Sequence, residues 1–416
     1  MAEQAKVPAI RFAGFTDPWE QRKASEVFQI VDDRGHPTLP VLSATQNQGM
    51  IYRDDSGRYI GHDESNEIGY KRVLPGDFVV HLRSFQGGFA HSQYEGITSP
   101  AYTVFRAKEP TSHSDRFWKH WFMSEHFIAG LSTVTYGIRD GRSISVDEFM
   151  NTFLAFPAVE EQAAISRLFD YLDDLITLHQ RKYDKLVIFK KSMLEKMFPK
   201  DGESVPEIRF AGFTDPWEQR KFGDCFEFLK SNTLSRAGLN GENGTARNVH
   251  YGDILIKFGD CLDDERSDLP FITDDTVLPK YAGSILREGD VIFADTAEDE
   301  TAGKCVELRK LPKEPTISGL HTIPARPRFP FGTGYLGHYL NSDAYHRQLL
   351  PLMQGIKVIS VSKAALQDTQ VRFPGLSEQS AIGAALNEID SLITLHQRKL
   401  ELLQNIKKSL LDKMFV

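Results

Sequence analysis

The chain contains two segments that each occur twice, and this duplication restricts the possible folds more than any other feature. Residues 7–23 read VPAIRFAGFTDPWEQRK and residues 205–221 read VPEIRFAGFTDPWEQRK, so only Ala9 and Glu207 differ among 17 positions. We call these the signature segments. Residues 160–198 and 377–415 match at 21 of 39 positions and share the block LITLHQRK. The sequence therefore predicts a tandem repeat, in which each half has a signature, a globular head and a long helix.

The second repeated segment has the periodicity of a coiled-coil helix. Apolar residues alternate at intervals of three and four from Ile165 to Met193, and again from Ile382 to Leu410. This spacing is typical of coiled coils. Pro157 and Pro374 suit a helix entrance. Two matched helices in one chain can pair antiparallel, so we predict a rod with a head at each end, related by a pseudo-two-fold axis.

Two histidines lie on the apolar stripes of these helices. His179 and His396 occupy the same place in the repeated block LITLHQRK. We interpret them as polar core residues that fix the helix register. A metal site or a proton switch is the alternative.

The two heads differ in sequence although the segments around them match. Their short β-type runs and Gly/Pro punctuation predict two mixed α+β domains. We place the first head in residues 1–155, the first spacer helix in 156–199, the second head in 200–372 and the second spacer helix in 373–416. The expected strands are Ser25–Val31, Arg72–His81, Ala101–Phe105, Asp253–Phe258, Gly289–Ala294 and Lys304–Leu308, and the expected helices are Asp115–Phe127 and Tyr335–Leu350.

The composition narrows the class of protein. No apolar run approaches the roughly 20 residues of a membrane helix, and the N-terminus lacks a secretory signal. The three cysteines, which lie far apart, suggest neither a disulfide framework nor a zinc site. We therefore expect a cytoplasmic protein. Its net charge of −8 does not favour binding to nucleic-acid phosphates, so any nucleic-acid-binding surface would have to be a local basic patch or be supplied by partners.

Glycine-containing loops with basic and amide side chains are the candidate DNA-binding sites. Arginine and glutamine suit base edges, and lysine suits phosphates. Taken singly, each loop is more simply read as an ordinary turn. The candidate DNA-binding residues are Arg83, Gln86, Gly87, Tyr136, Arg139 and Arg142 in the first head, and Lys257, Lys304, His321, Gln354 and Lys357 in the second.

The chain resembles the DNA-specificity subunits of type I restriction–modification systems over essentially its whole length. The match is carried by the paired IRFAGFTDPWEQRK segments, the paired Phe-Pro helix starts and the paired LITLHQRK helices. The runs LPGDFVV, YGDILI, LREGDVIF and ISGLHTIPAR also resemble target recognition domains. The resemblance implies two target recognition domains, each reading half of a bipartite, asymmetric site in double-stranded DNA.

The same resemblance implies a subunit with no catalytic centre and no cofactor of its own. Two methyltransferase subunits would bind the conserved helices and supply S-adenosylmethionine for adenine-N6 methylation. Restriction subunits would add ATP- and magnesium-dependent translocation and cleavage. No membrane partner is expected.

Three other functions fit single features of the sequence. An adenine methyltransferase would need an Asp/Asn-Pro-Pro-aromatic loop, which Asp17-Pro18-Trp19 only approaches. A nuclease could use the acidic cluster of Asp295, Glu298, Asp299 and Glu300, yet Glu307-Leu308-Arg309 lacks the expected Glu-x-Lys. Gly332–Gly337 matches GxGxxG but lacks the context of a dinucleotide site. A coiled-coil scaffold without a DNA role is favoured by the acidic net charge and opposed by two unlike heads on one frame.

Overall fold

The computed structural model describes residues 7–45, 48–57, 64–80, 88–131, 135–136, 143–263 and 269–416. Contacts divide the chain into two compact units. Unit 1 is Met1–Gln180 with Arg398–Val416, and unit 2 is Arg181–Gln397. The predicted domains follow the sequence repeats, whereas the units follow contacts and divide the chain inside long helices. No helix among the described residues combines the length and apolar character needed to cross a membrane.

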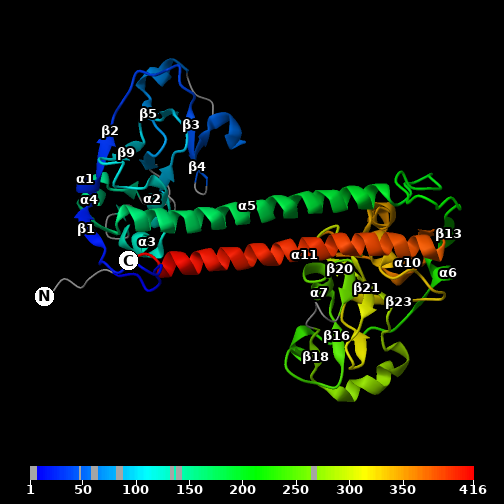
Figure 1. The fold of residues 1–416 in the computed structure, drawn as a ribbon. Coiled ribbons are helices and arrows are strands. Elements are labelled where there is room, and N and C mark those ends of the chain that lie inside the picture. The colour runs from blue at the N-terminus through cyan, green and yellow to red at the C-terminus, as the bar shows by residue number, and fades with distance from the viewer. Residues whose placement is uncertain are drawn as a thin grey trace. The chain divides into compact units, whose positions relative to one another are not determined.

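Unit 1 contains a four-stranded antiparallel sheet in the order β2-β9-β6-β7. Strands β2 and β9 of this sheet are labelled in Figure 1. Its strands are β1 Glu20–Lys23, β2 Phe28–Val31, β3 Leu42–Thr45, β4 Gly49–Tyr52, β5 Lys71–Val73, β6 Phe78–Val80, β7 Phe89–His91, β8 Gly96–Thr98, β9 Thr103–Ala107, β10 Thr135–Tyr136, β11 Ser143–Ile144 and β12 Phe153–Phe156. Its short helices are α1 Ala24–Val27, η1 Arg53–Ser56, η2 Glu64–Gly69, α2 Asp115–Trp121, α3 Glu125–Leu131 and α4 Val146–Asn151.

The core of unit 1 is aromatic. Helix α2 begins where the side chain of Ser114 accepts a hydrogen bond from the backbone N–H of Phe117, as an N-cap residue does. Phe117 and Trp118 are then fully buried. Phe415, near the C-terminus of the chain, joins this core because its ring lies 5.7 Å from that of Phe117.

Unit 2 contains a five-stranded sheet, β14-β23-β19-β21-β17, and a four-stranded sheet, β15-β18-β16-β22. Its strands are β13 Glu218–Lys221, β14 Phe226–Phe228, β15 Leu239–Asn240, β16 Arg247–Val249, β17 Cys261–Asp263, β18 Phe271–Ile272, β19 Val291–Ala294, β20 Thr296–Ala297, β21 Cys305–Lys310, β22 Thr316–Ser318, β23 Thr322–Pro327, β24 Ile359–Ser360 and β25 Gln370–Phe373. Its short helices are α6 Phe222–Cys225, η3 Arg236–Gly238, α7 Tyr251–Ile256, η5 Asp275–Ser284, α8 Tyr335–Asn341, α9 Asp343–His346, η6 Leu350–Leu352 and α10 Lys363–Asp368.

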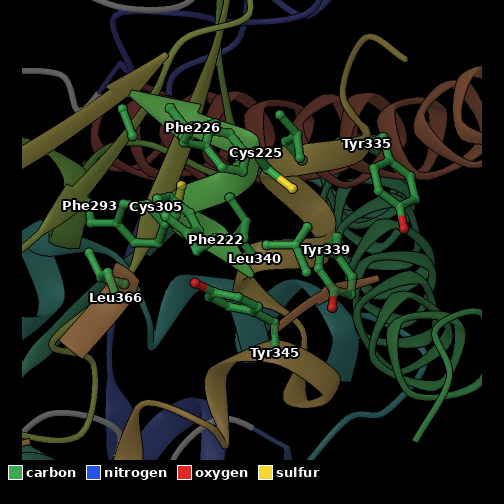
Figure 2. Packing of buried hydrophobic residues seen from close by; sticks show 14 of the residues in the cluster. Phe222, Cys225, Phe226, Phe293, Cys305, Tyr335, Tyr339, Leu340, Tyr345 and Leu366 are labelled. Carbon is green, nitrogen blue, oxygen red and sulfur yellow. The ribbon is translucent and has the colours of Figure 1, made fainter. Parts of the chain in front are cut away.

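The core of unit 2 packs aromatic rings from three helices against the five-stranded sheet (Figure 2). Phe222 stacks on Phe226 with ring centroids 4.2 Å apart. Tyr335, Tyr339 and Tyr345 are fully buried, and burial raises the pKa of Tyr335 and Tyr345 far above the ordinary value. Their hydroxyls remain bonded. Tyr335 donates to the carbonyl of Arg372, Tyr339 accepts from the Arg372 N–H, and Tyr345 shares a hydrogen bond with Thr369.

Most predicted elements are present, but several differ. The expected strand Ser25–Val31 begins as the short helix α1 and is a strand only over β2. The expected strand Arg72–His81 is divided into β5 and β6 by the turn at Gly76, and the expected helix Asp115–Phe127 is divided into α2 and α3.

The expected strand Asp253–Phe258 is helix α7. The imidazole of His250 accepts a hydrogen bond from Gly252 N–H and starts the helix. Helical geometry buries Asp253 and Ile254 and leaves Ile256 86% exposed, whereas a strand would place Ile254 and Ile256 on one face. The expected helix Tyr335–Leu350 is divided into α8 and α9 at Ser342.

The Gly-Asp turns before β6 and β19 share one structure. Gly76 and Gly289 have φ values of 92° and 85°, which favour glycine. The aspartate that follows each is buried, and it accepts a hydrogen bond from the backbone N–H three residues earlier. Arg106 bonds Asp77 through two nitrogens, and Arg326 bonds Asp290 in the same way. The motif is therefore a structural turn.

The two long helices have matching bounds. Helix α5 spans Val159–Lys196 and helix α11 spans Leu376–Lys413, each with 38 residues. Adding 217 to the bounds of α5 gives those of α11. In unit 1, Asp173 of α5 pairs with Lys407 of α11 at 2.5 Å. In unit 2, Lys190 of α5 pairs with Asp390 of α11 at 2.6 Å. These two ion pairs occupy equivalent positions of the repeat.

Each unit closes on its signature segment in the same way. Strand β1 pairs antiparallel with β12, and β13 pairs with β25, in matching registers that set Glu20 opposite Phe156 and Glu218 opposite Phe373. Arg11 forms a two-pronged bond to Glu161 at the start of α5. Arg209 does the same with Glu378 at the start of α11.

Candidate nucleic-acid interface

The candidate residues of the first head lie largely outside the described part of the chain. Arg83, Gln86, Gly87, Arg139 and Arg142 fall in segments that are not described. Tyr136 is in strand β10, and its side chain is not described. The candidate interface is therefore built from the second head.

His321 lies in a strained turn between β22 and β23. Its φ of 54° is the only positive value among the described non-glycine residues. Such a conformation costs on the order of 1 kcal/mol or more and often marks a functional site. The turn is held by neighbouring residues, because Gly319 N–H donates to the carbonyl of Val249 at 2.8 Å and a Cβ on Gly319 would lie 2.3 Å from Asn248 Oδ1.

The imidazole of His321 is nearly half exposed. Its Nδ1 lies 3.3 Å from Asp295 Oδ1, and its ring lies edge-on to Tyr251 at 5.3 Å. The backbone N–H of Asp295 donates to the carbonyl of His321 at 3.0 Å. The polar edge of this ring can therefore meet a ligand while the backbone stays fixed.

Gln354 and Lys357 lie in an exposed loop just before β24, a strand that pairs with β20. Gln354 and Ser360 exchange two backbone hydrogen bonds, and Gly355 turns the chain with φ 119°. Ile356 at the tip is 98% exposed. Strand β24, which ends this loop, pairs with β20 beside Asp295. The Asp295–Ala297 stretch therefore brings this loop and His321 into one neighbourhood.

Lys257 follows helix α7, whose Tyr251 contacts His321. Its ammonium lies 3.3 Å from Asp253 Oδ1, and the side chain remains 56% exposed. Burial would raise the pKa of Asp253, but the bonds from Arg236 and Lys257 outweigh it and the pKa lies below its ordinary value. A negative charge is thus held under two exposed cations, Arg236 and Lys257.

Lys304 is held inside the second head by hydrogen bonds to backbone carbonyls. Its ammonium donates to the carbonyls of Leu255 at 3.1 Å and Phe258 at 2.9 Å, which satisfies the end of α7. Burial lowers its pKa. The structure does not place Lys304 with the exposed group of Lys257, His321, Gln354 and Lys357.

The known proteins to which this chain is similar are specificity subunits of type I restriction enzymes. No family model matches the chain. The MjaVIII type I restriction enzyme specificity subunit of Methanocaldococcus jannaschii is 24% identical over 275 residues, which are 64% of this chain and 61% of that protein. The match thus spans less than two thirds of this relative. The MjaX specificity subunit of the same organism is 21% identical over 95% of this chain and 92% of its own.

Two solved structures share the fold. The type I restriction–modification S subunit from M. genitalium has a TM-score of 0.56 at 11% identity, with 99% of each chain covered. A chain from a study of type I restriction–modification complex assembly has a TM-score of 0.51 at 17% identity, over 95% of this chain and 97% of its own.

The chain is similar to type I specificity subunits.

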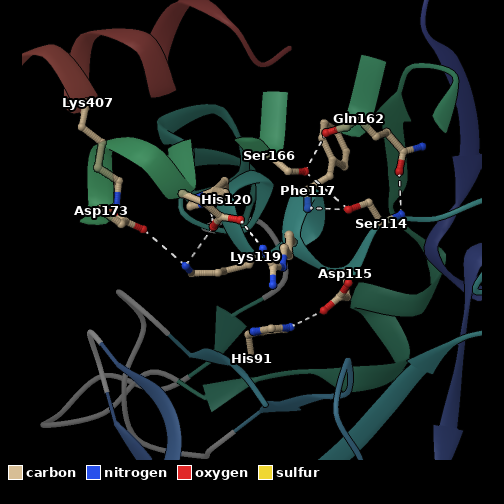
Figure 3. A network of polar contacts seen from close by, with 12 residues as sticks. His91, Ser114, Asp115, Phe117, Lys119, His120, Gln162, Ser166, Asp173 and Lys407 are labelled. Carbon is tan, nitrogen blue, oxygen red and sulfur yellow. Dashed lines mark hydrogen bonds and ion pairs between the residues drawn. The ribbon is translucent and has the colours of Figure 1, made fainter. Parts of the chain in front are cut away.

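This similarity confirms the resemblance inferred from the paired signatures and helices. The sequence did not predict one further feature of this specificity-subunit-like chain. Each unit contains a polar cluster, and the two clusters occupy equivalent places. In unit 1, buried His120 lies 3.1 Å from Asp170, while Lys119 and Lys407 pair with Asp173 (Figure 3). The repeat does contain a signal for these clusters, because Asp173 matches Asp390 and Lys190 matches Lys407 when the two helix segments are aligned at the offset of 217.

The cluster in unit 2 is built from the same parts. His338 lies 2.9 Å from Asp260 and 3.1 Å from Asn387, and Lys190 lies 2.6 Å from both Asp260 and Asp390. His120, Asp170 and Asp173, like Asp260, His338 and Asp390, have the spacing of metal ligands. In each group a lysine ammonium already supplies the positive charge, so we interpret them as structural ion-pair networks.

The features that suggested other functions have structural explanations. A Cβ on Gly337 would lie 2.2 Å from the carbonyl of Asp260, so this glycine of GxGxxG permits close packing of α8. Buried Glu307 accepts hydrogen bonds from Gly334 N–H and Gly337 N–H, and burial raises its pKa. Asp299 bonds Thr301 within its own turn. Trp19 is buried in the core of unit 1.

Proposed function

We propose that this chain is the DNA-specificity subunit of a type I restriction–modification complex in the cytoplasm. Each head reads one half of a bipartite site in double-stranded DNA. Partner subunits supply the chemistry, namely S-adenosylmethionine-dependent adenine methylation by two methyltransferase subunits and ATP- and magnesium-dependent restriction. The chain itself acts by recognition, without a catalytic centre.

The observation that carries this proposal is the duplicated frame with two unlike heads. The helix bounds, the closing strands and the Arg–Glu bonds recur in both units, while the heads have different sheets. A frame that repeats serves one assembly role twice, and heads that differ suit two different ligands. Similarity to specificity subunits over most of the chain supports this assignment.

We propose that exposed polar residues of the second head read DNA. Gln354 can present an amide to base edges, and Lys257 and Lys357 can meet phosphates. His321 stands on a backbone that neighbouring residues hold in place. We further propose that α5 and α11 pair antiparallel as a coiled coil and set the distance between half-sites, with His179 and His396 as register residues.

The test is to express the chain with its methyltransferase subunit in a host that lacks adenine methylation, and to sequence the methylome. We expect one motif with two short specified parts and a fixed gap. A methylated motif with a single continuous specified part would contradict the two-headed function. Absence of methylation, together with no salt-dependent DNA binding by the purified complex, would favour the scaffold alternative.

A further inference from the structure

We propose that a cavity in unit 2 binds a small phosphate ester of the size of a nucleotide. We call it the arginine cavity, because Arg287, Arg309, Arg326 and Arg328 line it together with apolar residues. Its volume of about 520 Å³ lies within the range of small-molecule sites in proteins.

The arginine cavity lies at one end of strands β19 and β23, and His321 lies at the other. Asp290, which directly precedes β19, and Arg326 of β23 line the cavity. At the far end of this strand pair Ala294 is opposite Thr322, which directly follows His321. The cavity is therefore separate from the residues proposed to read DNA, and its ligand is an additional one.

Three of the four arginines are available to a ligand. Arg326 is bound through two nitrogens by Asp290. Arg287 and Arg328 are exposed, and neither forms an ion pair with another described residue. The Nε of Arg309 is buried and has no hydrogen-bond partner among the described residues. A buried donor without a partner is uncommon in a folded protein and calls for an acceptor from outside the chain.

The charge of the lining favours an anion. Four arginines face three carboxylates, those of Glu288, Asp290 and Glu307, which leaves an excess of one positive charge in a chain of net charge −8. Glu307 accepts hydrogen bonds from two backbone N–H groups, and burial raises its pKa, which weakens its negative charge. The cavity beside the first signature has the opposite balance, with five carboxylates and two arginines.

The fold does not require these arginines, because the first head lacks them. The shared Gly-Asp turns and strand registers align the two heads, with Asp77 on Asp290 and His91 on Glu307. The residues of unit 1 equivalent to the three available arginines are Leu74, Gln93 and Lys108. The two heads thus share the turn and differ in the charge around it, as expected for a ligand that binds one head only.

The shape and chemistry of the lining select the class of ligand. Guanidinium groups present planar pairs of N–H donors that match the oxygens of a phosphate. Phe329, Pro330, Phe331 and Leu336 form an apolar wall beside them, and the two phenylalanine rings stack with centroids 5.0 Å apart. A phosphate that carries a planar ring therefore matches the cavity better than inorganic phosphate does.

The backbone around the arginine cavity is already fixed. The N–H of Arg287 donates to the carboxylate of Asp290 at 2.8 Å. The N–H of Gly289 donates to the carbonyl of Leu308 at 2.7 Å, and that of Arg328 donates to the carbonyl of Cys225 at 2.8 Å. A ligand would thus order only side chains, which lowers the entropic cost of binding.

Calorimetric titration of the purified full chain with AMP tests the proposal. We expect one AMP per chain, weaker binding of inorganic phosphate, and at least a tenfold loss of AMP affinity in Arg287→Gln, Arg309→Gln and Arg328→Gln. Arg287 and Arg328 are exposed, so their variants should keep the thermal midpoint even if Arg309→Gln unfolds. Arg347→Gln is the matched control, because this arginine is 70% exposed and lies outside the cavity, and it should bind AMP as the wild type does.

A short DNA duplex added as competitor separates the two sources of phosphate. AMP that stays bound in its presence would support a free nucleotide as the ligand. Displacement of AMP by the duplex would show that the cavity holds a DNA phosphate and would overturn the small-molecule assignment. Absence of AMP binding at millimolar concentration, or equal affinity in the wild type and the three cavity variants, would overturn the site. Each of these outcomes leaves the proposed function of the chain intact.

Discussion

At the scale of single residues, His321 combines strain with exposure. Its positive φ is imposed by the turn, whereas its imidazole is available beside Asp295. Glycine adopts such a φ without strain. Replacement by glycine therefore separates the side chain's contribution to recognition from its contribution to folding.

We predict that His321→Gly keeps or slightly raises the thermal midpoint and relaxes recognition of one half-site. Loss of a base contact costs about 1–3 kcal/mol, which corresponds to a 5- to 150-fold loss of affinity for the cognate DNA. Methylome sequencing should show degeneracy in one half-site and an unchanged requirement in the other. Arg347→Ala is the control, since this arginine directly after α9 is 70% exposed and forms an ion pair with Asp343. An unchanged half-site in His321→Gly would remove His321 from the interface.

A second prediction at this scale concerns Asp170 and acid stability. Burial would raise its pKa, but the hydrogen bond from His120 and the charges of Lys119 and Arg116 outweigh burial and lower the pKa to about 2. A pKa that is lowered by folding stabilises the folded state above the unfolded pKa, and the stability is lost as pH falls toward the folded pKa. Because Asp170 is partly exposed, we expect a contribution of about 1 kcal/mol.

Urea unfolding between pH 5 and pH 2 measures this contribution. The midpoint of the wild-type chain should fall across that window, and Asp170→Asn should fall less steeply. Asparagine is the residue that unit 2 has at the equivalent position, Asn387. Identical slopes for the two chains would show that Asp170 is not the titrating group.

At the scale of elements, the sequence predicts best where one periodicity dominates. The spacer helices predicted over 156–199 and 373–416 lie within three residues of α5 and α11 at each end. Residues 253–258 read as a strand because β-branched and apolar residues follow one another there. The His250 cap and the Asp253–Arg236 bond favour the helix instead. Contacts between residues far apart in sequence decide such short segments.

The candidate site shows the same limit. The sequence shows which basic residues lie near glycines, but it does not show whether the folded chain buries or exposes their side chains. Lys304 and Lys257 look alike in sequence, yet one ammonium is bound by two carbonyls and the other is exposed. The cross-helix ion pairs were missed because Asp173, Lys190 and their counterparts are ordinary polar positions until the partner helix is known.

The duplicated ion pairs allow a prediction with an internal control. Lys190 pairs with Asp260 and Asp390, whereas its counterpart Lys407 pairs with Asp173 alone among the described contacts. Lys190→Met leaves Asp260 and Asp390, which are 13% and 26% exposed, without their shared cation. Breaking a buried pair costs about 3–5 kcal/mol, and partial exposure brings the expected loss here to about 2–3 kcal/mol. We expect Lys407→Met to cost less. Differential scanning calorimetry of both variants should show the larger loss for Lys190→Met, and an equal loss would mean that Asp260 does not depend on Lys190.

At the scale of the whole molecule, the proposed function assigns separate roles to heads and helices. The heads contact the bases, and the long helices set the distance between the two half-sites. The two roles can be altered independently, because the closing strands β1–β12 and β13–β25 keep the same register whatever head they enclose. Changing the helices should therefore alter the gap in the DNA site without altering either half-site.

The change that tests this is one heptad added at the same place in both helices, after Lys182 and after Lys399. Seven residues preserve the alternating apolar spacing and lengthen a helix by roughly 10 Å at about 1.5 Å per residue. At about 3.4 Å per base pair along one strand, we expect a gap longer by roughly three base pairs. Methylome sequencing of the variant reads the gap and both half-sites at once. A heptad added to one helix alone is the control, since it breaks the match between the helices and should abolish methylation. If the doubly extended chain methylated sites with the original gap, the helices would not set the distance between half-sites.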